Sequence, residues 1–152
     1  MNHAILIFFA AIAGIASSCA PIPKINTISG KPQIIINRDM ATVKNKISSD
    51  FVMHGNTILN ETSRSIRFAA DMNTGNAMLY KVAMGNSYSS DPSLQYDFNF
   101  ISQGKNGTLV SGRVITVMQN AFGRSQNTDL SKGKAGVELQ NYFVQAKKKL
   151  EK

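Results

Sequence analysis

LQYDFNF, at residues 94–100, alternates apolar and polar side chains at every position. Alternation with a period of two is typical of a strand that buries one face and exposes the other. A turn-forming segment from Gly104 to Gly107 follows, and residues 109–118, LVSGRVITVM, form a second apolar run. The sequence therefore predicts a hairpin of two long antiparallel strands at the centre of the fold.

Several shorter segments also have the composition of strands. Residues 33–36 read QIII, and residues 56–61 and 65–69 are two apolar runs joined by a polar turn. Residues 77–85 alternate again, with methionine, tyrosine and valine on one face. The polar, glycine-containing segment 119–134 is predicted to be a long loop.

Two segments have helical periodicity. The first is expected to begin at Asn37 as its N-cap, to carry Asp39 in its first turn, and to end at Gly55 in a left-handed conformation. The second, from about Gly136 to Leu150, has an apolar stripe and ends in lysines that suit the negative end of the helix dipole. The predicted class is α+β: a mainly antiparallel sheet of four to six strands with an N-terminal and a C-terminal helix packed on one face.

The beginning of the chain carries an export pattern. An uncharged apolar segment from Ala4 to Ala16 precedes two serines and Cys19, the only cysteine of the sequence. This segment is shorter than the roughly 20 apolar residues of a transmembrane helix but has the length of the apolar region of a signal peptide. The arrangement resembles the export signal of bacterial lipoproteins, in which a lipidated cysteine becomes the first residue of the mature chain.

The resemblance implies a division of the chain and a location. Residues 1–18 would be the signal peptide, residues 19–32 the lipidated cysteine with a proline-containing tether, and residues 33–152 a single domain. In this family several acyl chains on the cysteine form a stable membrane anchor. Ala20 stands where an aspartate would resemble an inner-membrane retention signal, so the expected location is the periplasmic side of the outer membrane. Small residues before and after Cys19 also suit an ordinary signal peptidase, and export without lipidation is the alternative.

The predicted order of elements is also similar to that of the helix-grip domains of envelope-assembly lipoproteins. This resemblance concerns topology alone, because no sequence motif carries it. Since Cys19 is the only cysteine, an intrachain disulfide is excluded, and apolar burial has to hold the domain together.

The chain is strongly basic, with 17 lysines and arginines against nine aspartates and glutamates, a formal net charge of +8. Cations crowd near its C-terminal end, where they suit an anionic membrane surface or envelope polymer, or simply a solvated helix end. Export and the lack of alternating basic and aromatic residues exclude nucleic acid as the expected partner. The candidate residues for an anionic surface are Arg124, Lys132, Lys134, Lys147, Lys148 and Lys149.

The sequence offers little for catalysis or metal binding. After the signal segment His54 is the only histidine, and it lies at a predicted helix end, where capping or packing explains it. The glycines form no phosphate-binding fingerprint. No catalytic residue, metal ligand or cofactor is therefore predicted. The carboxylates weighed for acid–base chemistry are scattered over different predicted elements: Asp71, Asp91, Asp97, Asp129 and Glu138.

These observations favour two functions. The first is a membrane-anchored, non-enzymatic lipoprotein that binds another envelope protein or acts as a scaffold. The second is a periplasmic binder or carrier of a small apolar or lipid-like ligand in a cleft between sheet and helix. Side chains expected in such a cleft, if they are not simply core, are Met72, Met78, Tyr80, Met84, Tyr88 and Tyr96.

Overall fold

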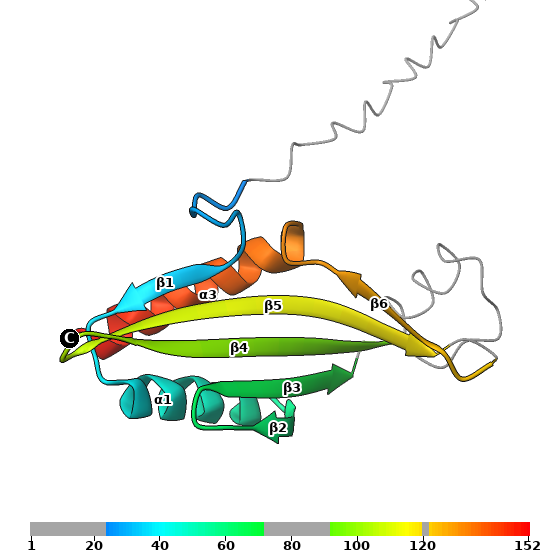
Figure 1. The fold of residues 1–152 in the computed structure, drawn as a ribbon, viewed down its shortest axis with the longest axis horizontal. Helices are drawn as coiled ribbons and strands as arrows, with labels where there is room; N and C mark the ends of the chain where they lie inside the picture. Colours follow the sequence, from blue (N-terminus) through cyan, green and yellow to red (C-terminus); the bar gives the residue numbers. More distant parts are fainter. Residues whose placement is uncertain (1–23, 72–91, 120–121) are drawn as a thin grey trace, which may run out of the picture.

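The computed structural model describes residues 24–71, 92–119 and 122–152. Six strands form one antiparallel sheet in the order β1-β5-β4-β3-β2, and β6 pairs with β5 beside β1 (Figure 1). Both helices contribute side chains to one core against the sheet, so the predicted α+β class is confirmed. The elements are β1 (Gln33–Ile36), α1 (Met40–Met53), β2 (Thr57–Glu61), β3 (Ser65–Asp71), β4 (Ser93–Gln103), β5 (Gly107–Gln119), β6 (Ser125–Asp129) and α3 (Lys134–Leu150).

The predicted hairpin is the longest pairing of the sheet. β4 and β5 pair from Ser93 opposite Val117 to Gln103 opposite Gly107. Gly104 in the connecting turn has φ of 68°, a left-handed conformation that glycine adopts at little cost. The predicted alternation is confirmed, since Phe98 and Phe100 belong to the buried core and Leu94 and Tyr96 pack against it.

The first helix begins two residues later than expected. Asp39 is the N-cap, and its carboxylate accepts a hydrogen bond from the Thr42 amide at 2.9 Å. The prediction of Asn37 as the cap is therefore wrong, and Asp39 precedes the first turn instead of lying in it. Aspartate at this position satisfies an amide that has no partner within the helix and carries the charge that the helix dipole favours. The predicted left-handed end is confirmed, because Gly55 has φ of 83°.

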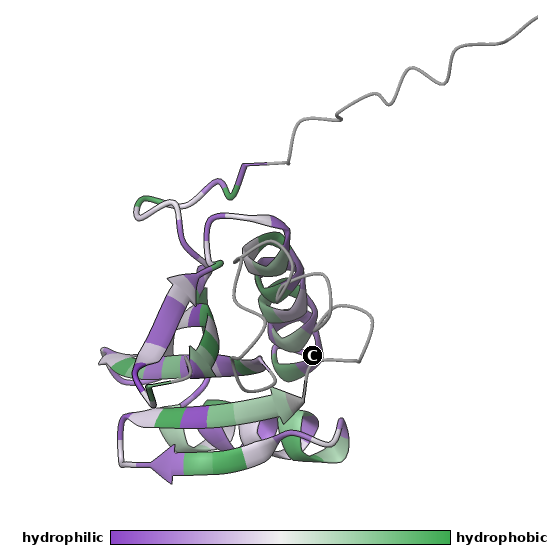
Figure 2. Cartoon of the chain, turned by 90° about the vertical axis from the view of Figure 1, so that its right-hand side faces the viewer, coloured by the Kyte–Doolittle hydropathy of each residue, from purple (hydrophilic) through white to green (hydrophobic). Residues whose placement is uncertain are grey.

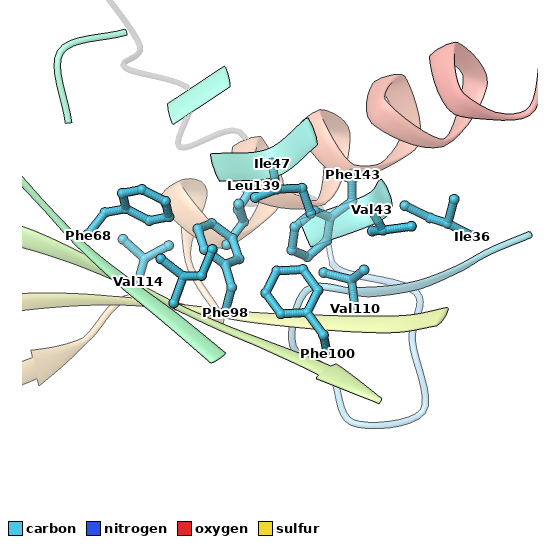
Figure 3. Packing of buried hydrophobic residues seen from close by; sticks show 11 residues of the cluster. Ile36, Val43, Ile47, Phe68, Phe98, Phe100, Val110, Val114, Leu139 and Phe143 are labelled. Carbon is cyan, nitrogen blue, oxygen red and sulfur yellow. The ribbon is translucent and has the colours of Figure 1, made fainter. Parts of the chain in front are cut away.

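One apolar core lies between the sheet and the two helices (Figure 3). Gly112 on β5 lets α3 approach closely, since a Cβ atom there would lie 2.7 Å from Leu139 Cδ2 and 2.9 Å from Phe143 Cζ. Interiors are close-packed, so even one added methyl group there would force neighbouring atoms apart. The buried cluster is Ile36, Val43, Ile47, Ile66, Phe68, Phe98, Phe100, Val110, Val114, Leu139 and Phe143.

The predicted loop at residues 119–134 is wrong in its middle. β6 pairs with the second half of β5, from Gln119 opposite Ser125 to Ile115 opposite Asp129. Its side chains are polar and largely exposed, so its sequence has no apolar alternation from which a strand could be predicted. Backbone hydrogen bonds to β5 hold it in the sheet. Asp129 at its end forms an ion pair with Lys31 at 3.1 Å.

The last residues of the predicted tether are part of the folded domain. Thr27 Oγ1 donates to the Lys31 carbonyl oxygen at 2.7 Å, which closes a turn. The carbonyl oxygen of the buried Pro32 accepts a hydrogen bond from the Gly112 amide at 2.9 Å, which joins this segment to β5. The signal segment, Cys19 and the predicted strand 77–85 lie outside the described residues.

Candidate functional site

A half-open cleft of about 260 Å³ lies where the end of α1 faces the beginning of α3 over β4. Aromatic and aliphatic side chains provide most of its surface, and polar groups stand among them. Such a mixture is typical of small-ligand sites. The cleft is lined by Asp50, Phe51, His54, Asn56, Tyr96, Ala135, Glu138, Leu139 and Tyr142.

Three aromatic rings from three elements meet in the cleft. Phe51 on α1 lies 5.2 Å from the ring of Tyr96 on β4 and 5.3 Å from the ring of Tyr142 on α3, measured between centroids. The interplanar angles are 71° and 80°, so both tyrosine rings stand nearly perpendicular to Phe51. Contacts of Phe51 with Phe68 and Phe98 join this group to the core and hold it in place.

A buried carboxylate connects the two helices beside these rings. Asp50 is 8% exposed, and its Oδ1 lies 2.6 Å from Lys46 Nζ one turn earlier. Its Oδ2 accepts a hydrogen bond from the Tyr142 hydroxyl at 3.1 Å. Burial raises the pKa of Tyr142 well above its usual range, and the negative charge of Asp50 raises it further. Tyr142 is therefore a neutral donor at physiological pH.

His54, Asn56 and Glu138 complete the polar part of the cleft. The His54 Nδ1 atom lies 2.6 Å from the Asp50 carbonyl oxygen, which makes Nδ1 the donor and leaves Nε2 as an acceptor when the ring is neutral. His54 is also the C-cap residue of α1, in agreement with its predicted position. Burial raises the pKa of Tyr96, and the charge of Glu138, which lines the same cleft, raises it further.

Among the carboxylates weighed from the sequence, the three with described side chains, Asp97, Asp129 and Glu138, lie at separate places. Glu138 lines the cleft, whereas Asp97 lies on the other face of the sheet and binds Arg67 with Nε 2.6 Å from Oδ1. Asp129 lies at the end of β6, and Asp91 is outside the described residues. Within the described ranges no three histidine, cysteine or acidic side chains are placed to hold a metal ion. No helix among the described residues is long and apolar enough to cross a membrane.

β1 and β6 lie along one edge of the sheet and β2 forms the other, and β1 and β2 differ in how their outer sides are covered. Side chains of α3 occupy the outer edge of β1: Gln140 accepts from the Gln33 amide at 2.8 Å and donates to its carbonyl oxygen at 3.2 Å. Lys147 Nζ donates to the Ile35 carbonyl oxygen at 2.8 Å. These bonds satisfy backbone groups that would otherwise attract another strand.

β2 forms the opposite edge, and within the described part of the chain it pairs with β3 alone. All five of its residues are exposed, and hydrophobic residues are visible along it in Figure 2. A register shift between Ile58 and Asn60 marks a bulge. We call Val52, Met53, Ile58 and Leu59 the α1–β2 apolar group; their exposed fractions are 48%, 72%, 39% and 50%.

The six cations proposed from the sequence do not form one patch. Lys132 and Lys134 lie at the beginning of α3, and Lys148 and Lys149 are exposed at its end, roughly 20 Å away at 1.5 Å per residue. Lys147 is engaged with the β1 edge. Arg124 precedes β6, at the end of that strand remote from Lys132. The exposed lysines therefore form two separate basic groups, one at each end of α3.

Most residues that line the cleft do not follow from the sequence pattern. Tyr96 was a candidate and lines it, whereas the other candidates, Met72, Met78, Tyr80, Met84 and Tyr88, lie outside the described residues. The sequence feature that could have indicated the cleft is local: Asp50 and Phe51 are adjacent at the end of a predicted helix. Their partners on α3 are too distant in the sequence for any spacing rule. Comparisons with protein-family models, curated proteins and solved structures found no match to this chain.

Proposed function

We propose that this protein is a lipid-anchored bacterial envelope protein that acts by binding another envelope protein, without catalysis. The export pattern ending at Cys19 supports the anchor, with the domain on the periplasmic side of the outer membrane. The α1–β2 apolar group is the observation that supports a protein partner. Its four exposed apolar side chains lie on two elements that follow each other in the chain, and exposed apolar groups of this kind are typical of interaction sites.

The two edges of the sheet differ in how accessible they are to a protein partner. The β1 edge is occupied by Gln140 and Lys147, and it is the edge next to which the N-terminal segment enters the domain (Figure 1). The β2 edge lies at the other end of the strand order. With the chain anchored through Cys19, the β2 side is the one more distant from the entry of the tether and is available to a partner.

The chemistry of the surface restricts the partner. A short, bulged edge strand pairs poorly with another backbone, so side-chain contact with the α1–β2 apolar group carries the interaction. The net charge of +8 opposes association of two copies of this chain and favours an acidic partner. The proposed occupant is therefore a segment of an envelope protein that presents apolar side chains flanked by aspartate or glutamate.

Site-specific photo-crosslinking in intact cells tests this proposal. A photoreactive residue at Leu59, which is 50% exposed, is expected to give one adduct of constant mass. The matched control is Ile101, which is 52% exposed on β4 and is expected to give none. Met53→Glu should reduce the Leu59 adduct more than Met53→Lys, because both remove the apolar side chain but only glutamate repels an acidic partner. Equal adducts at Leu59 and Ile101, or equal effects of the two Met53 variants, would contradict the proposal.

A second candidate function is the binding of a small apolar or lipid-like ligand in the α1–α3 cleft. Its support is the cavity of about 260 Å³ with three aromatic rings and Leu139 at its surface. Native mass spectrometry of protein extracted from its own membranes tests it. A retained compound of defined mass that is lost in Tyr96→Leu would support this function, and its equal retention in Tyr96→Leu would place the compound elsewhere.

The basic ends of α3 add a subsidiary proposal. Exposed lysines near an anionic membrane or envelope polymer contribute about 1 kcal/mol each at close approach. Lys148 and Lys149 are exposed at one end of the helix, and Lys132 and Lys134 at the other. We propose that these residues orient the anchored domain over an anionic surface and do not recognise one compound.

A further inference from the structure

We propose that the α1–α3 cleft binds a small organic cation, an ammonium group carried on a short apolar body. This inference rests on the second candidate function, the small-ligand cleft, and specifies the chemical class of its ligand. It is carried by the arrangement of Phe51, Tyr96 and Tyr142 and by the carboxylate of Glu138 at the same cavity.

The aromatic rings provide the first part of the argument. Tyr96 and Tyr142 stand at 71° and 80° to Phe51, with ring centroids 5.2 Å and 5.3 Å from it. The faces of aromatic rings carry negative partial charge, and a cation within about 6 Å of a ring centroid is attracted to them. All three rings line the same cavity, so a single ammonium group bound there lies within reach of more than one ring. An uncharged ligand of the same shape gains only the apolar contact.

Charge in the cleft provides the second part. The nine described residues that line it include Asp50 and Glu138 but no lysine or arginine, although the chain as a whole carries a net charge of +8. The charge of Asp50 is already balanced by Lys46, whose Nζ lies 2.6 Å from Oδ1, and its Oδ2 accepts the hydrogen bond from the Tyr142 hydroxyl. Glu138 is therefore the carboxylate available to a ligand.

Glu138 is only weakly engaged within the protein. The Nζ atom of Lys134 lies 3.9 Å from its Oε1, and the two side chains are 86% and 67% exposed. Exposed pairs of this kind on a helix contribute little and exchange readily with other partners. Glu138 and Tyr96 line the same cavity, so carboxylate and ring can act on one bound cation, in agreement with the contribution of the Glu138 charge to the raised pKa of Tyr96.

The size of the cleft limits the ligand. Its volume of about 260 Å³ is below the roughly 300–1,000 Å³ typical of sites for drug-sized ligands. A compact ammonium group with a few additional carbon atoms suits this space. Leu139 and Ala135 on α3 supply the apolar surface for that body.

A titration with two ligands of equal shape tests the proposal. The probes are choline and 3,3-dimethyl-1-butanol, in which a carbon atom replaces the charged nitrogen, each added to the full-length protein in a non-ionic detergent and followed by ligand-observed NMR. Choline is expected to bind about tenfold more tightly than the alcohol, in the range of a desolvated cation–π contact. The variant Tyr96→Phe should preserve this preference, and Tyr96→Leu should reduce it.

A second pair of variants tests the role of the Glu138 carboxylate. Glu138→Gln should weaken choline binding about fivefold with no effect on the alcohol. Glu61→Gln, which removes an acidic residue of β2 outside the cleft, should leave both affinities unchanged. Circular dichroism of each variant checks that the fold is preserved.

The failures of the two proposals are distinguishable. If the alcohol binds as tightly as choline and Tyr96→Leu weakens both, the cleft takes a neutral apolar ligand: the second function stands and the cation proposal is overturned. If choline and the alcohol both fail to bind at tens of millimolar, the small-ligand function fails as well. If choline binds but Glu138→Gln and Glu61→Gln act alike, the assignment of Glu138 is overturned.

Discussion

The Tyr142 hydroxyl donates a hydrogen bond to Oδ2 of Asp50 at 3.1 Å and thereby connects α3 to α1 beside the cleft. The Asp50 carboxylate is almost fully buried, so each of its hydrogen bonds offsets part of the cost of removing it from water. The cleft and the stability of the domain therefore depend on the same pair of side chains.

Tyr142→Phe removes this hydrogen bond and keeps the ring that packs 5.3 Å from Phe51. We expect the free energy of unfolding to fall by about 1–2 kcal/mol, because a buried charged acceptor loses one of its donors. Urea unfolding followed by circular dichroism measures the change. An unchanged unfolding midpoint would mean that Lys46 alone satisfies Asp50.

Gln140→Ala tests the protection of the β1 edge. The side-chain amide of Gln140 makes the two hydrogen bonds with Gln33 that a neighbouring strand would otherwise make. Its removal should lower the free energy of unfolding by about 1–2 kcal/mol and leave a strand edge that favours association. Gln145→Ala is the matched control, since Gln145 is an exposed glutamine of the same helix. Urea unfolding and sedimentation velocity are the measurements. Similar stability and similar association of the two variants would contradict a protective role.

Gly136→Ala separates packing from helix propensity. Alanine is favoured over glycine inside a helix by about 1 kcal/mol, which alone predicts a more stable protein. Here a Cβ atom would lie 1.8 Å from the Ser131 carbonyl oxygen, so the backbone has to move. We expect a net loss of about 1–3 kcal/mol in urea unfolding. Asn141→Ala, at an exposed position of α3, should instead be neutral or slightly stabilising. A stabilised Gly136→Ala would refute the close approach.

Asp129 predicts a component of acid sensitivity. Burial alone would raise the pKa of Asp129, but hydrogen bonds from Ser131 and the charge of Lys31 outweigh it and lower the pKa from 3.8 to about 2. The folded protein therefore binds this proton less readily than the unfolded chain, so the stabilisation is complete above about pH 4. It is lost as the pH falls toward 2.

Asp129→Asn gives the corresponding measurement. The difference in free energy of unfolding between the wild type and this variant should be largest near neutral pH and should shrink between pH 4 and about pH 2. Asp129 is about one-third exposed, so solvent screens the effect and only its pH dependence is diagnostic. A difference that stays constant from pH 6 to pH 2 would show that the carboxylate has no special pairing in the folded state.

The parts of the fold that were predictable follow from local patterns. The β4–β5 hairpin could be predicted because LQYDFNF places every second side chain in the core, and α1 and α3 because their apolar residues recur with helical spacing. β6 could not be predicted, since SQNTD has no apolar face and is held by backbone pairing to β5 and by the ion pair of Asp129 with Lys31. Asn37 and Asp39 are both good capping residues, so residue type does not distinguish them. Asp39 is the cap because the first helical turn begins at Met40.

The candidate cleft was only partly predictable for a related reason. Tyr96 follows from the alternation in β4, but Tyr142 and Glu138 reach the same cavity from α3, which comes after β5 and β6 in the sequence. Sequence spacing carries information over a helical turn or a hairpin and not over such distances. The C-terminal cations were expected to form one group because they are close in the sequence. They do not, because α3 places them at its two opposite ends.

The proposed function depends on the proposed lipid anchor at Cys19, and intact-mass analysis combined with membrane fractionation tests this anchor most directly. The full-length protein is expected to gain the mass of a diacylglyceryl group and an N-acyl chain on Cys19 and to sediment with the outer membrane. Cys19→Ser should carry neither modification and should lose this association. Identical fractionation of both proteins as unmodified soluble species would contradict the account.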